Sequence, residues 1–277
     1  MREVEKEMSF LDHLEELRWH LVRALSAVVV FTVIAFVFNT WIFETIVFAP
    51  AKVDFFTFRA LCKVGHLVGF EESLCVTEIP MQIQSRLMMG QFTMALTSSF
   101  IIGIIVAFPF ASWEIWRFIK PGLHPTEKKY SRGAVASISF LFFLGVSFGY
   151  YVMCPLAVYF LASYQISDIV INQFDITSYV STISTLILGS GLLFQLPVVV
   201  YFLTQVGMVT PAFLKQYRKH AIVIILVVAA IITPPDPISQ TLISIPLFML
   251  YEFSIFVSAV VMRRKARQEA LDALNEK

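Results

Sequence analysis

Long apolar segments separated by short polar stretches dominate the hydrophobic pattern of this chain. Six such segments occupy residues 21–47, 92–112, 133–161, 179–206, 221–232 and 238–262. A helix rises ~1.5 Å per residue, and the hydrocarbon core of a membrane is roughly 30 Å thick. Five of the segments are therefore long enough to cross a membrane as helices, and the pattern predicts a chain that crosses it repeatedly.

The fifth segment, 221–232, is the exception, because twelve residues in a helix span only about 18 Å. It follows the basic stretch 215–219 and ends at the proline-rich stretch 233–237, and the sixth segment begins directly afterwards. The pattern predicts a helical hairpin whose tip, with Asp236, lies within the membrane or draws its outer surface inward. Unsatisfied polar groups are unfavourable at that depth, so a tip of this kind indicates a site.

Composition supports a membrane protein of many spans and excludes a soluble globule. The 277 residues are 57 % hydrophobic and 15 % charged, and their mean hydropathy is +0.75. We therefore expect an all-α fold, a single membrane domain over residues 1–277 in which six tilted transmembrane helices form a bundle. The short fifth and sixth helices cannot close this bundle, so it should curve around a concave face.

The distribution of basic residues predicts the orientation in the membrane. An even number of spans puts both termini on one side, and seventeen of the 21 Lys and Arg residues fall in the stretches on that side (1–23, 113–132, 207–219 and 261–277). The positive-inside rule then makes both termini cytoplasmic, as expected for a multi-pass protein of the cytoplasmic (inner) membrane. Cytoplasmic parts are thus 1–20, the loops 113–132 and 207–219, and the tail 263–277. The net charge of +1 gives no indication of a nucleic-acid partner.

The largest part outside the membrane is the periplasmic stretch 44–91. Its many apolar residues favour a small cap packed over the bundle, although a mobile loop is the alternative. Cys62 and Cys75 both lie in it, thirteen residues apart. Two cysteines in an oxidising compartment are a possible disulfide, and two buried thiols are the alternative.

Residues 1–20 read as an amphipathic helix on the cytoplasmic surface that continues into the first span. One apolar face is formed by residues at spacings of three and four, namely Phe10, Leu14, Leu17 and Leu21. His13, Glu16 and His20 share a neighbouring face. An interfacial anchor is one interpretation. However, such anchors prefer Lys and Arg, so a carboxylate here also indicates a site that receives a cation.

A second polar cluster follows the second span. Pro121 and Gly122 interrupt the helix there, and the stretch 126–129 resembles the capped start of the next one. Glu127 would lie in the first turn of that helix, where the helix dipole favours a carboxylate. Ordinary helix capping and a functional site are both open interpretations of this glutamate.

Four motifs in these regions resemble those of the TatC family, the multispanning receptor subunit of the twin-arginine protein translocase. They are HLxELR at 13–18, WxFxxPxLxxxEKK at 116–129, FxxP at 194–197 and TPPDxxSQT at 233–241. The likeness covers nearly the whole chain in the same order.

The resemblance implies a receptor that binds twin-arginine signal peptides of folded cargo proteins at the cytoplasmic face. It also implies assembly with single-span TatA-type and TatB-type subunits, transport driven by the proton-motive force, and a homo-oligomer in the receptor complex. The residues that match the family's signal-peptide site are Glu16, Arg18, Phe118, Glu127 and Lys129. Those that match its docking site for a partner span are Thr233 and Gln240.

The chain departs from the family at Gln195 in the fourth span, where many members carry glutamate. A neutral amide is less costly to bury than a carboxylate, and it cannot titrate, so a proton-carrying role is not expected at this position. The amide would instead hold a water or a partner's polar side chain, or form a hydrogen bond between helices.

Other classes of membrane protein fit the sequence less well. A secondary transporter with a site at the short fifth/sixth hairpin is the main alternative, but inverted repeats are not visible. An enzyme would need a catalytic pair or metal ligands, whereas the five histidines are scattered and the three cysteines lack ligand spacing. We therefore expect no enzyme activity, no catalytic residue, no metal and no cofactor.

Overall fold

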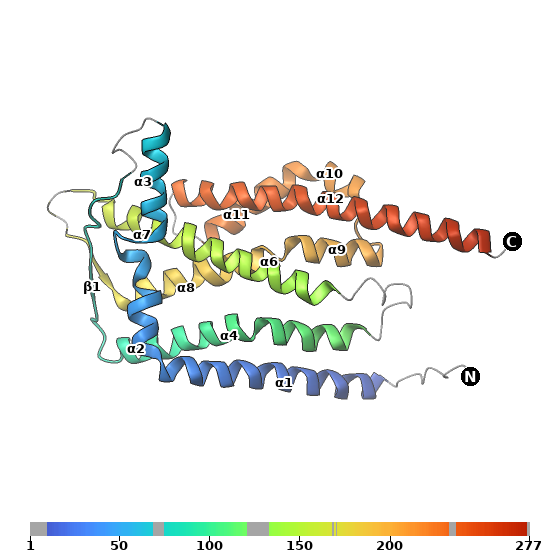
Figure 1. Cartoon of the computed structure of the whole chain (residues 1–277), viewed down its shortest axis with the longest axis horizontal. Helices are drawn as coiled ribbons and strands as arrows, with labels where there is room; N and C mark the ends of the chain where they lie inside the picture. Colours follow the sequence, from blue (N-terminus) through green and yellow to red (C-terminus); the bar gives the residue numbers. More distant parts are fainter. Residues whose placement is uncertain are drawn as a thin grey trace. The chain divides into compact units, whose positions relative to one another are not determined.

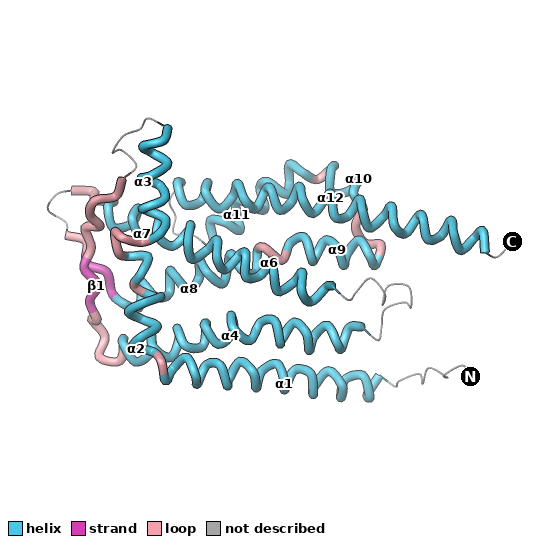
Figure 2. Tube along the Cα trace, in the orientation of Figure 1, coloured by secondary structure: helices cyan, strands magenta, loops and turns pink. Residues whose placement is uncertain are grey.

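The computed structural model describes residues 10–68, 75–120, 133–167, 169, 171–232 and 237–275, which are almost entirely helical (Figures 1 and 2). The chain divides into two compact units. The first comprises Met1–Ile42 and Phe92–Phe140, and the second comprises Phe43–Gln91 and Leu141–Lys277. The predicted all-α class is confirmed. Short paired strands, β1 (Gln82–Gln84) and β2 (Gln173–Asp175), lie parallel to each other and were not predicted.

The first unit contains α1 (Phe10–Val37), α2 (Asn39–Ile42) and α4 (Gly90–Ile119). Neither glycine nor proline occurs in α1, so the amphipathic start continues into the span without a break. The first span was expected to end at residue 47. This was wrong, because α1 ends ten residues earlier, just before the polar residues Asn39 and Thr40, whose side chains hydrogen-bond to each other at 3.1 Å.

Helices α1 and α4 lie side by side and approach closely at Gly103 (Figure 1). A Cβ atom added to Gly103 would lie 2.8 Å from the backbone nitrogen of Thr32, so the glycine is needed for this approach. Further along the pair, the rings of Phe36 and Phe92 meet edge to face with centroids 6.3 Å apart. Small residues and van der Waals contacts of this kind hold helices together in lipid.

The described part of the stretch 44–91 is a folded segment within the second unit. It contains a π-turn (Phe43–Val47), a 3₁₀ turn (Ala49–Ala51) and the helix α3 (Phe56–Val68). The Tyr179 hydroxyl donates a hydrogen bond to the Val47 carbonyl at 2.8 Å, and the Tyr150 hydroxyl donates one to Ile46 at 3.0 Å. These contacts tie the described part of the stretch to the chain around residues 150 and 179, and the cap over the bundle stays a prediction.

The third and fourth spans are each built from two helices. The third is α6 (Ala134–Phe148), a π-turn (Gly149–Met153) and α7 (Cys154–Ser163). The fourth is α8 (Ile176–Leu193) and α9 (Leu196–Val206), with a turn at 194–195 just before Pro197. A Cβ atom on Gly145 would lie 2.6 Å from the carbonyl oxygen of Ser190, so α6 and α8 also depend on a glycine for close packing.

The last part of the chain forms α10 (Pro211–Gln216), α11 (Arg218–Ile232) and α12 (Pro237–Asn275). Helix α11 has 15 residues and is unusually short, as expected for the fifth span. Five described helical stretches are long and apolar enough to cross a membrane: Leu14–Val37, Gly90–Ile119, Ala134–Ser163, Ile176–Val206 and Ile243–Arg267.

Two polar stretches contain more helix than the sequence indicated. The stretch 113–132 was expected as a loop but is helical as far as Ile119, and 207–219 contains α10 and the start of α11. Helix α12 continues through the basic tail to Asn275. Thr233 and Asp236 at the hairpin tip lie outside the described residues, and the expected concave face stays a prediction.

Candidate functional site

The first unit carries the described part of the predicted signal-peptide site. Glu16 and Arg18 lie near the start of α1, and Phe118 lies near the end of α4. Arg18 is exposed, whereas Glu16 and Phe118 are half-buried. Glu127 and Lys129 lie in 121–132, outside the described residues, so their roles stay predictions.

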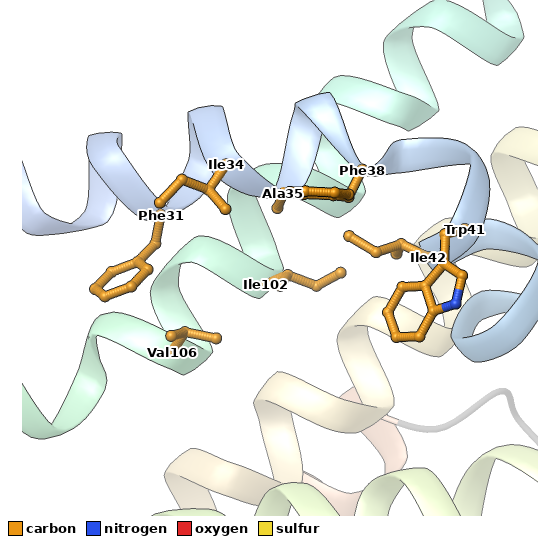
Figure 3. A pocket seen from close by; sticks show the side chains of 8 residues that line it. All are labelled: Phe31, Ile34, Ala35, Phe38, Trp41, Ile42, Ile102 and Val106. Atoms are coloured by element: carbon orange, nitrogen blue, oxygen red, sulfur yellow. The ribbon is translucent and has the colours of Figure 1, made fainter.

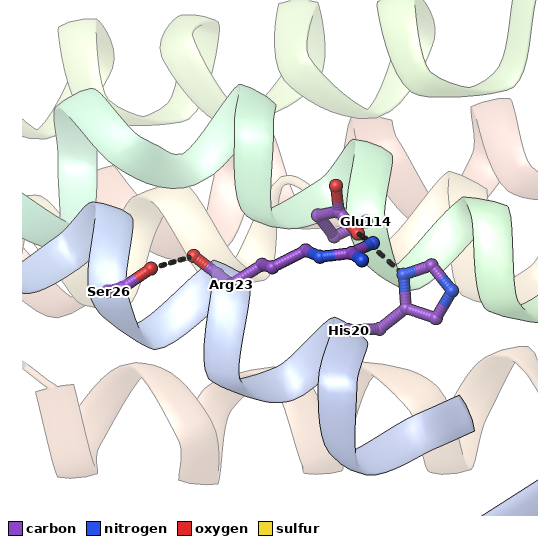
Figure 4. A network of polar contacts seen from close by, with 4 residues as sticks. All are labelled: His20, Arg23, Ser26 and Glu114. Carbon is purple, nitrogen blue, oxygen red and sulfur yellow. Dashed lines mark hydrogen bonds and ion pairs between the residues drawn. The ribbon is translucent and has the colours of Figure 1, made fainter. Parts of the chain in front are cut away.

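A buried ion pair joins α1 to α4 at this end (Figure 4). His20 Nδ1 lies 2.5 Å from Glu114 Oε2, and the two side chains are only 7 % and 3 % exposed. Arg23 Nη1 lies 3.8 Å from the same carboxylate oxygen and is about half exposed. A carboxylate buried to this degree needs charged or hydrogen-bonding partners, and His20 and Arg23 supply them.

The ion pair lies directly beside the predicted site residues. Residues four apart on a helix are neighbours on its surface. Glu16 is four residues before His20 on α1, and Phe118 is four residues after Glu114 on α4. The His20 and Phe118 rings have centroids 6.3 Å apart, so the pair contacts the site directly.

One carboxylate oxygen in this cluster has an open acceptor position. Glu16 Oε2 is buried, and no group in the described part of the chain donates a hydrogen bond to it. Such an atom is unfavourable until it acquires a donor, and a charged donor gives the strongest hydrogen bond. The arrangement is therefore suited to receive a cation such as a guanidinium.

The helical pattern of the sequence placed His20 on the same face as Glu16, whereas Glu114 was not predicted. The signal was present, since a carboxylate two residues beyond a predicted span is unusual and indicates a partner. The partner was not identifiable, because it lies 94 residues away in the chain.

The residues predicted to dock a partner span lie around the α11–α12 hairpin. Gln240 Nε2 donates a hydrogen bond to the Leu226 carbonyl at 3.2 Å, so its amide group has a partner within the hairpin. Thr233 lies outside the described residues. Further along α12, Glu252 pairs with Arg218 at 2.7 Å.

Gln195 lies at the turn between α8 and α9, where the fourth span is interrupted. It is half-buried, and its backbone carbonyl accepts hydrogen bonds from Val198 and Val199 at 2.9 Å and 3.0 Å. The turn places the amide where the regular helix is broken. The role of its side chain stays a prediction.

Cys62 and Cys75 are joined by a disulfide in the structure, with Cα atoms 4.4 Å apart. His66 Nε2 lies 3.6 Å from one sulfur and 3.7 Å from the other. These three side chains are grouped closely enough for metal ligands, but sulfurs joined in a disulfide are not thiolate ligands. The group therefore ties the end of α3 to the chain that leads to β1.

An apolar hollow of about 630 Å³ lies between α1, α2 and α4 in the first unit (Figure 3). It is lined by hydrophobic side chains: Phe31, Ile34, Ala35, Phe38, Trp41, Ile42, Ile102 and Val106. A lining of this kind suits hydrocarbon and offers little to a polar ligand.

Comparison with known proteins agrees with this architecture. The model of the TatC family, described as Sec-independent protein translocase protein, matches residues 12–246. A TatC protein of Blattabacterium is 41 % identical over 266 residues, which are 96 % of this chain and 100 % of the relative. One of Halalkalibacterium halodurans is 35 % identical over 96 % of this chain and 95 % of its own.

A crystal structure of a twin-arginine translocase receptor, TatC, in DDM has a TM-score of 0.70 and 30 % identity, covering 89 % of this chain and 99 % of that one. These likenesses support the receptor interpretation over a secondary transporter. With its apolar spans, short fifth helix and matching motifs, this multi-pass membrane protein belongs to the TatC family of twin-arginine translocase receptor subunits.

Proposed function

We propose that this chain binds the twin-arginine signal peptides of folded proteins at the cytoplasmic face of the inner membrane and is a core subunit of the export complex. The observation that carries the proposal is the half-buried carboxylate of Glu16 at the joined ends of α1 and α4, with one buried oxygen that lacks a donor among the described groups. A signal-peptide arginine would supply that donor.

The chemistry of the site favours arginine over other cations. A guanidinium is planar and donates two parallel hydrogen bonds to one carboxylate, whereas an ammonium acts as a point charge. Two consecutive arginines need two carboxylates, and Glu127 would be the second, with Phe118 and Lys129 beside it. Partial burial lowers the local dielectric and strengthens each pair without making it irreversible.

The rest of the proposal concerns orientation and assembly. The basic residues favour cytoplasmic termini, so the ends of α1 and α4 would face arriving cargo. Thr233 and Gln240 would dock the single span of a TatA-type or TatB-type partner at the short hairpin. Transport through the assembled homo-oligomeric complex would draw on the proton-motive force.

Binding of a labelled twin-arginine peptide to the purified protein tests this function. We expect Glu127→Ala to abolish binding and Glu16→Ala to weaken it about tenfold or more, because each leaves a guanidinium partly desolvated and unpaired. Glu15→Ala is the matched control, since Glu15 is exposed and adjacent in sequence. Wild-type affinity in Glu127→Ala, or an equal loss in Glu15→Ala, would contradict the proposal.

A further inference from the structure

His20 and Glu114, which form the buried ion pair, are not among the residues that the family motifs assign to signal recognition. We propose that these two residues are positioning residues of the signal-peptide site, which hold Glu16 and Phe118 in the relative placement that distinguishes arginine from lysine. The inference rests on the proposed function and assigns the residues that set its specificity.

The geometry connects the pair to the site on both helices. Because His20 follows Glu16 by four residues, the two side chains emerge from the same side of α1. Glu114 and Phe118 are related in the same way on α4. A contact of 2.5 Å between His20 and Glu114 therefore sets both the distance and the rotation between the helix faces that carry Glu16 and Phe118.

Because the pair is buried, its contact restricts how far the ends of α1 and α4 can move relative to each other. Both side chains are almost inaccessible, and Arg23 at 3.8 Å is the other basic side chain described next to Glu114. Removal of His20 leaves the buried Glu114 carboxylate with the longer Arg23 contact, and removal of Glu114 leaves His20 buried without its carboxylate partner. In both cases the helix ends should shift until water or another partner reaches the buried group. A small shift is enough to spoil a bidentate hydrogen bond, since such bonds weaken steeply with angle.

Other contacts hold α1 on α4 independently of the pair. These are the close approach of Gly103 to Thr32 and the contact between Phe36 and Phe92. Loss of the ion pair should therefore displace the helix ends while the helices stay docked. This separates a positioning role from a role in folding.

The consequence is a specific change in selectivity. A guanidinium requires an oriented carboxylate, but an ammonium accepts many approach directions. Displacement of Glu16 should reduce affinity for a twin-arginine peptide much more than affinity for the same peptide with two lysines. A defect in folding would instead lower the amount of binding-competent protein and leave the ratio of the two affinities unchanged.

The test measures the dissociation constants of both peptides for the purified full-length chain. We expect His20→Ala and Glu114→Gln each to lower the arginine-to-lysine affinity ratio about tenfold, a change of ~1.4 kcal/mol. The exchanged pair, His20→Glu with Glu114→His, should recover part of the lost arginine-to-lysine affinity ratio. Glu252→Gln is the control, because it breaks the ion pair with Arg218 in the other unit and should leave the ratio unchanged.

The outcomes separate this inference from the function on which it rests. A wild-type chain that does not bind the twin-arginine peptide contradicts the proposed function. A wild-type chain that binds it, with an unchanged ratio in Glu114→Gln and His20→Ala, overturns the inference alone. If the single variants do not fold, the exchanged pair decides the question. An arginine-to-lysine affinity ratio in the exchanged pair that is no higher than the ratio in Glu16→Ala would overturn the positioning role.

A double-mutant cycle gives an independent result. If the pair acts through Glu16, His20→Ala should have little further effect on the ratio in a Glu16→Ala background. Effects of the two substitutions that add independently would overturn the positioning role.

Discussion

Gly103 in α4 provides the most direct test of how the first unit is packed. In Gly103→Ala the new Cβ atom would lie 2.8 Å from the backbone nitrogen and 3.0 Å from the Cα of Thr32. Non-bonded carbon atoms are most favourable at roughly 3.5–4.0 Å, so α1 and α4 must separate by about 0.5–1 Å at this point. The nearest atom would be Thr32 Oγ1, whose side chain can rotate, but the next two atoms belong to the backbone, so a side-chain rotation cannot fully relieve the contact.

Overpacking of this kind destabilises proteins by about 1–3 kcal/mol. We expect Gly103→Ala to lower the midpoint of thermal unfolding in detergent by several degrees, measured by circular dichroism. Gly133→Ala is the matched control, since no atom of the described residues lies within 4 Å of a Cβ atom there. Equal midpoints for the two variants would refute the reasoning, as would complete rescue of Gly103→Ala by Thr32→Ala.

Further predictions concern the second unit. Hydrogen bonds from the Thr177 hydroxyl and backbone to Asp175 lower the pKa of this carboxyl below its usual 3.8. The ionised carboxylate should therefore stabilise the fold above pH 3.8, and this stabilisation should be lost as the pH falls through the lowered pKa. The free energy of unfolding, measured against pH, should show this loss in the wild type but not in Asp175→Asn. Neither Cys62 nor Cys75 should react with an impermeant maleimide before reduction, and reduction should destabilise the protein by about 3 kcal/mol without loss of signal binding. Gln240→Leu should impair transport, and a cysteine at 240 should crosslink to a partner span; normal transport and no crosslink would refute docking there.

Much of the helical architecture follows from the apolar pattern, because long hydrophobic segments have few alternatives to a helix in lipid. The pattern did not predict where the first span ends, since residues 38–47 remain largely apolar although α1 is interrupted after Val37. It also did not predict the pairing of β1 with β2. That pairing joins segments about 90 residues apart, and three-residue strands have no recognisable periodicity.

The site was predictable to a different degree. The family motifs indicated Glu16 and Phe118, and the helical pattern placed His20 beside Glu16. The role of Glu114 depends on the crossing of α1 and α4, which is set by the glycine contact at Gly103 and not by the local sequence around either residue. Partners brought together by helix packing become visible only when the packing is known.

Site-specific photocrosslinking tests the central claim most directly. In one variant a photoreactive amino acid replaces Phe118 at the proposed site. In a control variant it replaces Phe213, an exposed aromatic residue of α10 in a stretch expected on the same membrane face. We expect a labelled twin-arginine peptide to crosslink at position 118 and not at 213. Excess unlabelled twin-arginine peptide should prevent this crosslink, whereas a twin-lysine peptide should not. Equal crosslinking at both positions, or no competition by the twin-arginine peptide, would contradict a signal-peptide site at the joined ends of α1 and α4.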